Sequence, residues 1–132
     1  MPSPQPFENL KFYQNICEIR RQTGKITARF DKSHMRLVSQ MRDAARSAKQ
    51  NIREGYRRGS LGNFLNSIRI SQGSLEELRG DLEDCYEDKL ISQQEFENLN
   101  RLIQSAGYMS TQYLKAMSKP ENKTKWIAQD RA

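Results

Sequence analysis

The sequence predicts an all-α protein, specifically an antiparallel up-down-up-down four-helix bundle. Apolar residues recur at steps of three and four in four long stretches, and no stretch shows the strict alternation of a half-buried strand. Only a few residues separate these stretches, so consecutive helices should run antiparallel. We expect the bundle to span residues 7–117, after a disordered N-terminal segment, 1–6, and before a basic C-terminal tail, 118–132, that is mobile or docks elsewhere.

The first two helices follow from apolar stripes over 7–30 and 35–56. The first stripe passes through Gly24, which weakens the helix there. The second stripe contains several alanines, which predict close contact with a neighbouring helix. It ends at Gly59, since glycine readily adopts the left-handed backbone conformation that often follows a helix.

The third and fourth helices are marked by capping residues. Ser60 can cap a helix whose stripe covers 61–85. Ser92 and Glu95 have the spacing of a capping box, in which each side chain accepts from the other residue's backbone amide, and the stripe over 96–117 follows. In the tail, Trp126 is interpreted as a packing anchor, with stacking on a nucleic-acid base as the alternative.

Composition argues against several classes of protein. Mean hydropathy is -0.90, no apolar run is long enough to span a membrane, and the N-terminus lacks the regions of a secretory signal, so we expect a cytoplasmic protein without membrane contact. Cys17 and Cys85 with the single His34 leave no zinc or haem ligand set, so we expect both to be buried free thiols and expect no cofactor. His34 should cap or be solvated, and we expect no enzyme.

Charge is distributed unevenly along the chain. The net charge is +6, but residues 1–59 carry +8, residues 60–91 carry -4 and residues 92–132 carry +2. Such polarisation predicts either a phosphate-bearing partner or association of a positive face with a negative one.

Two charged ridges produce this asymmetry. The side chains of the first ridge lie within an arc of about 80° around the second helix, because successive residues are rotated by about 100°. This basic ridge consists of Arg42, Arg46, Lys49, Arg53 and Arg57. The corresponding acidic ridge of the third helix consists of Glu77, Asp81, Asp84 and Asp88.

Three interpretations of the ridges remain open. Both could be solvated faces that keep the protein soluble. The basic ridge of one subunit could meet the acidic ridge of the next in a head-to-tail contact that closes a ring. Alternatively, the basic ridge, with Arg58 and the lysines of the tail, could bind nucleic-acid phosphates without reading sequence. A ring would display the basic ridge repeatedly, so the last two are compatible.

Several short runs carry a resemblance to a known family. They are Ser39-Gln40-Met41-Arg42, Ala44-Ala45, Asn51-Ile52-Arg53-Glu54-Gly55 with Arg58 and Ser60, and Gly73-Ser74-Leu75-Glu76-Glu77-Leu78. They resemble the bacterial family of four-helix-bundle proteins encoded in intervening sequences of 23S ribosomal RNA genes. The resemblance implies a ring-like homopentamer that binds nucleic acid without known catalysis. It also implies a structural relationship to the accessory variability protein of diversity-generating retroelements, which works with a reverse transcriptase and its RNA.

The resembling segment also contains candidate interface residues. Asn51, Glu54 and Gly55 are interpreted as determinants of the fold or of the oligomer interface, together with the acidic ridge. Arg53 stands where the family has a small residue, and it lengthens the basic ridge, which favours a nucleic-acid or other charged partner.

The leading hypothesis is a non-enzymatic homo-oligomer that binds the phosphates of RNA or DNA, including as an accessory factor of a retroelement reverse transcriptase. The alternative is a structural or protein-interaction scaffold without a nucleic-acid ligand. The candidate nucleic-acid-binding residues are Arg42, Arg46, Lys49, Arg53, Arg57 and Arg58.

Overall fold

A computed structural model describes residues 6–131, and their side chains as far as Trp126. Every regular element in this range is helical, which confirms the all-α prediction. In chain order the elements are η1 (Pro6–Asn9), α1 (Lys11–Thr27), η2 (Lys32–His34), α2 (Met35–Arg57), α3 (Leu61–Glu87), α4 (Gln93–Met117) and α5 (Pro120–Arg131). Apart from Pro6, the N-terminal segment expected to be disordered lies outside the described residues.

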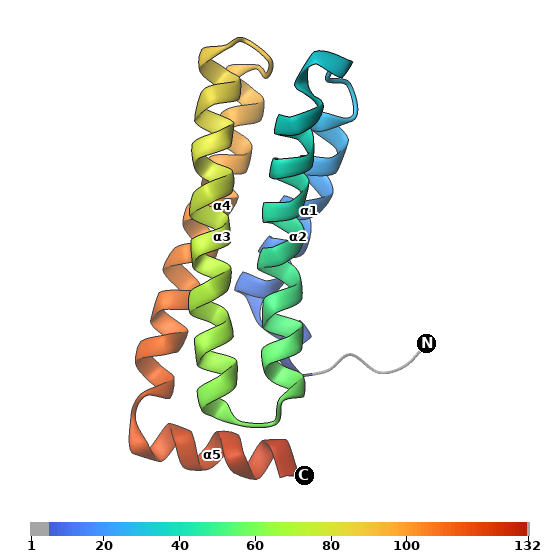
Figure 1. Ribbon diagram of the computed structural model, residues 1–132. Helices are drawn as coiled ribbons and strands as arrows, with labels where there is room; N and C mark the ends of the chain where they lie inside the picture. The colour runs from blue at the N-terminus through green and yellow to red at the C-terminus, as the bar shows by residue number, and fades with distance from the viewer. Residues whose placement is uncertain (1–5, 132) are drawn as a thin grey trace.

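The four long helices lie side by side, with α2 next to α3 and α1 next to α4 (Figure 1). The α2 helix also packs on α1, and α3 on α4, so the apolar stripes of all four meet in one core. The short α5 crosses the end at which α2 passes into α3. No helix of the described part is long and apolar enough to cross a membrane.

The predicted helix ends are found at two turns, the one between α2 and α3 and the one before α4. Gly59 follows α2 with a φ of +80°, and the Ser60 hydroxyl accepts from the Asn63 backbone N–H at 3.1 Å. At the start of α4 the Ser92 hydroxyl accepts from the Glu95 N–H at 3.1 Å, while the Glu95 carboxylate accepts from the Ser92 N–H at 2.9 Å. This is the capping box that the sequence predicts.

The first helix is shorter than its apolar stripe. Phe7 lies in η1, and α1 ends at Thr27, three residues before Phe30. The Asp31 carboxylate then accepts from the Ser33 N–H at 2.9 Å and starts η2. The apolar residues at both ends still pack against the core, so the periodicity correctly predicted burial but not helix length.

The closest helix contact is between α2 and α3. The Ser71 hydroxyl of α3 donates to the backbone carbonyl of Ala48 in α2 at 2.6 Å. A Cβ on Gly55 would lie 2.1 Å from the Ser67 Oγ and 2.3 Å from the Ser67 Cβ. Small residues on α2 therefore set the approach of α3, as the alanines predict.

Aromatic rings fill the end of the core beside α5. Phe64 stacks on Trp126 with ring centroids 6.1 Å apart, and Tyr56 meets Trp126 edge-on at 6.2 Å. The indole is 7% exposed, so Trp126 acts as a packing anchor. The sequence does not predict α5, because this helix has no apolar stripe and, among its described side chains, buries Trp126 alone.

Both cysteines are free thiols, as predicted, but the predicted burial holds only for Cys85. Cys17 is half-buried, whereas Cys85 is completely buried, with its Sγ 3.7 Å from the Met41 sulfur. Burial raises the pKa of Cys85 to about 11, which keeps this thiol protonated at neutral pH. Cys85 therefore behaves as a core residue.

Replacing Gly55 with Ala should lower the free energy of unfolding by about 1–3 kcal/mol, because the new methyl group forces α2 away from Ser67. The matched control is Gly73→Ala on α3, where a Cβ meets nothing within 4 Å, and which should raise stability by roughly 0.5–1 kcal/mol. Urea unfolding followed by circular dichroism measures both. Equal stability of Gly55→Ala and the parent would contradict the close contact.

Glu95 should make the stability of the folded state depend on pH. Its hydrogen-bonded ion pair with Arg29, together with the cap, lowers the Glu95 pKa from 4.5 to about 2. The ionised Glu95 side chain therefore stabilises the folded state above pH 4.5, and this contribution is lost as the pH falls towards 2. The Glu95→Gln variant keeps a side-chain oxygen that can accept from the Ser92 N–H, but it loses the negative charge.

The Glu95→Gln variant should accordingly melt at a lower temperature than the parent at neutral pH, and the two should converge near pH 2. The control is Glu76→Gln, since Glu76 is exposed and forms no ion pair with a described residue. A difference in melting temperature that stays constant from neutral to acid pH would show that the charge is unimportant.

Candidate nucleic-acid interface

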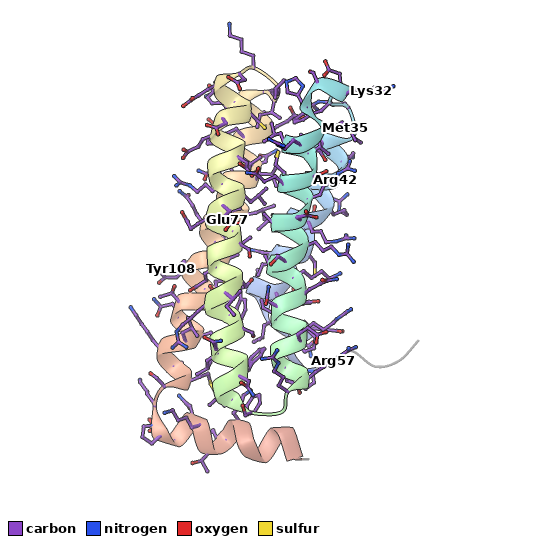
Figure 2. All side chains as sticks on the ribbon, viewed as in Figure 1. Lys32, Met35, Arg42, Arg57, Glu77 and Tyr108 are labelled. Carbon is purple, nitrogen blue, oxygen red and sulfur yellow. The ribbon has the colours of Figure 1, made fainter. Side chains whose placement is uncertain are left out.

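The basic ridge runs along the side of α2 that borders α1. Arg42 and Arg57 lie at two heights of α2, and Glu77 lies on α3 (Figure 2). All five ridge side chains are exposed except Lys49, which is half-buried. The ridge is therefore a continuous surface of one helix, but its members have different surroundings.

Arg42, near one end of the ridge, serves the fold. Its Nε donates to the Thr27 hydroxyl at 2.9 Å, and its second terminal nitrogen donates to the Gly24 carbonyl at 3.3 Å. These acceptors lie in the last turn of α1, where a positive charge also meets the negative end of the helix dipole. Arg42 therefore ties α2 to the end of α1.

The opposite end of the ridge is weakly paired. The Arg57 guanidinium lies 3.8 Å from the Glu54 carboxylate, with both side chains more than 60% exposed, so solvent screens the attraction. Arg58 follows as the C-cap of α2, and its side chain is exposed. Both arginines remain accessible to an anion.

The centre of the ridge gathers cations from two helices. Arg46, Lys49 and Arg53 meet Arg20 of α1 around a hollow of about 220 Å³. Gln50 completes the described lining, which contains no carboxylate. None of the four cations forms an ion pair with a described residue. We call this hollow, lined by these four cations and Gln50, the α1–α2 hollow.

Arg53 lies close enough to Tyr13 of α1 to affect its ionisation. The Arg53 charge lowers the Tyr13 pKa, although burial outweighs it and the net pKa is about 12. Arg20 was not among the candidates from the sequence, because the ridge was traced on one helix at a time. Its part in the hollow arises from the packing of α1 on α2.

The acidic ridge of α3 is not uniform either. Glu77, Asp84 and Asp88 are exposed, whereas Asp81 is 8% exposed and accepts from the Gln40 amide of α2 at 3.0 Å. Burial raises the pKa of Asp81 above its usual range. Asp81 thus contributes to contact between α2 and α3, and three carboxylates remain on the surface.

The remaining interface candidates lie on α2, where Gly55 faces α3 and Glu54 is exposed. The Asn51 amide donates to the Ser47 carbonyl at 2.8 Å and to its hydroxyl at 2.9 Å. Gly55 is buried against Ser67 within the protomer, so its close contact belongs to the fold. A second hollow of about 370 Å³ is lined by Asp43, Arg46, Ser47, Gln50, Asn51 and Glu54.

His34 and the acidic residues form no site with evident chemistry. The His34 Nδ1 lies 3.2 Å from the Asp31 carboxylate, at the start of α2, where it helps close the turn. Groups of three or more potential metal ligands are absent from the described residues. The α1–α2 hollow, with four cations and no carboxylate in its described lining, is therefore taken as the candidate site.

Comparison with protein families identifies a match over most of the chain. The family model described as 23S rRNA-intervening sequence protein matches residues 8–112. This range covers α1 to α3 and most of α4, including the α1–α2 hollow. A comparison with curated proteins gave no match.

Changing Arg42 to Gln should affect the free energy of unfolding more than changing Arg46 to Gln. Arg42→Gln loses both hydrogen bonds to the end of α1 and should lower the free energy of unfolding by about 1 kcal/mol. Arg46→Gln removes an exposed charge without a described partner and should stay within about 0.5 kcal/mol of the parent. Chemical unfolding measures both, and equal losses would refute the distinction.

Proposed function

Because the chain belongs to the 23S rRNA-intervening sequence protein family, we propose that it is a non-enzymatic, homo-oligomeric nucleic-acid-binding protein. It contacts backbone phosphates through the basic ridge and Arg20. The family description refers to an RNA context and is compatible with nucleic-acid association.

The observation that carries this proposal is the α1–α2 hollow. Four cations from two helices surround it without a lining carboxylate among the described residues. Arg57 and Arg58 continue the exposed positive surface to the end of α2. A linear array of cations on a helical face matches a polyanion and makes no contact that reads a base sequence.

The proposed protomer is an antiparallel up-down-up-down four-helix bundle. Two contacts support this direction, because Asn15 of α1 binds Ser105, while Arg29, in the turn that follows α1, binds Glu95, which precedes Ser105 in α4. Ring assembly would place exposed carboxylates of α3 on the basic surface of a neighbour. The family resemblance extends the proposal to a homopentamer in the cytoplasm that assists a retroelement reverse transcriptase.

A second candidate function is a protein-interaction scaffold without nucleic acid. The exposed carboxylates of α3 favour it, because they form an acidic surface that the basic ridge of another subunit could bind. They are Glu77, Asp84 and Asp88. Under this alternative the basic ridge is buried in the contact between subunits and does not bind nucleic acid. The two functions predict different effects of removing the ridge charges.

The nucleic-acid function predicts strongly salt-dependent binding. For duplex DNA the log–log slope of affinity against salt is about -0.9 per neutralised phosphate. Changing Arg46, Lys49 and Arg53 together to Gln should make this slope shallower by about 2 to 3. Fluorescence anisotropy with labelled duplex DNA and single-stranded RNA over a salt series measures it.

The matched control changes three exposed cations on α3 and α4, Arg69, Arg101 and Lys115, to Gln. It alters the net charge equally but should leave the slope nearly unchanged. Light scattering after size-exclusion chromatography follows assembly in parallel. An unchanged slope in the ridge variant would contradict phosphate binding, and loss of the oligomer together with an unchanged slope would favour the scaffold.

A further inference from the structure

The α1–α2 hollow carries more positive charge than a single backbone phosphate can balance. Four side chains, Arg20, Arg46, Lys49 and Arg53, each contribute one positive charge. A phosphodiester carries one negative charge, whereas a phosphate monoester carries about 1.5 to 2 near neutral pH. A phosphate monoester is therefore attracted to these four cations more strongly than any single phosphodiester is.

The fold holds these charges together against their repulsion. Three of them follow one another on α2 at steps of three and four residues, and the packing of α1 brings Arg20 to the same hollow. By contrast, Arg42 is hydrogen-bonded to the end of α1 and Arg57 is near Glu54. Unpaired charge is thus concentrated at the centre of the ridge.

The shape of the hollow is also compatible with such a group. A volume of about 220 Å³ accommodates a phosphate together with bound water, since one water occupies about 30 Å³. Arginine guanidinium groups can donate paired hydrogen bonds to phosphate oxygens, and the Gln50 amide adds a neutral donor.

We propose that the α1–α2 hollow is a subsite for a phosphate monoester, the group found at the 5′ end of a phosphorylated nucleic-acid strand. This inference rests on the proposed function and adds the end of the strand as the preferred ligand. Asp43 and Glu54 line the adjacent hollow and repel phosphodiesters there. The remainder of the strand therefore follows the ridge towards Arg57 and Arg58.

The test compares one single-stranded RNA oligonucleotide with a 5′-phosphate and the same oligonucleotide with a 5′-hydroxyl. The 5′-phosphorylated form should bind at least about tenfold more tightly, because it adds charge-assisted hydrogen bonds. This preference should decrease as pH falls through about 6, where the monoester gains a proton. Competition with AMP and with inorganic phosphate identifies whether a free monoester also enters.

Arg20→Gln separates the subsite from the ridge. It should weaken binding of the 5′-phosphorylated form by a clearly larger factor than binding of the 5′-hydroxyl form, and so reduce the preference for the 5′-phosphate. Arg46→Gln provides a second variant of the hollow and should also reduce the preference. The control, Arg58→Gln, lies outside the hollow and should weaken both forms by the same factor, so that their ratio is retained.

Equal affinity for the two oligonucleotides, without competition by AMP or phosphate, would overturn the subsite while leaving the proposed function intact. Equal weakening of both forms by Arg20→Gln would also overturn it. Binding of AMP without either strand would instead overturn the proposed function and support a monoester site for free nucleotides. Competition by the phosphorylated strand end alone would support the end of a strand as the ligand.

Discussion

Gly55 leaves room for Ser67, and this close approach of α2 and α3 determines the surfaces of the protein. A helix that presents small residues to one neighbour can rotate only slightly before larger side chains collide. With the Gly55 side of α2 against α3, the basic ridge borders α1. Arg46, Lys49 and Arg53 consequently meet Arg20, although no feature of α2 alone indicates a partner on α1.

The same packing divides the charged residues into structural and available groups. Arg42 and Asp81 belong to opposite ridges, yet each is used inside the protomer, the first at the end of α1 and the second with Gln40. The charges that remain free on the basic side are concentrated in the α1–α2 hollow. A ridge that was kept merely for solubility would not need its central cations to converge from two helices.

Local signals allowed much of the fold to be predicted. Gly59, Ser60 and the Ser92–Glu95 box act within a few residues, so their roles follow directly from sequence spacing. Arg20 and the fifth helix were missed because both depend on tertiary contacts: Arg20 joins a site on another helix, and α5 is anchored by a single described side chain, Trp126. The burial of Asp81 was missed for the same reason.

The central claim is that cations on α1 and α2 bind one phosphate group together. A double-mutant cycle of Arg20→Gln and Arg46→Gln, scored by affinity for a 5′-phosphorylated oligonucleotide, tests it most directly. A shared phosphate predicts a coupling energy of at least about 0.5 kcal/mol, with Lys115→Gln and Arg46→Gln as an additive control pair. Additivity of Arg20 and Arg46 within about 0.3 kcal/mol would contradict the claim and describe independent surface charges.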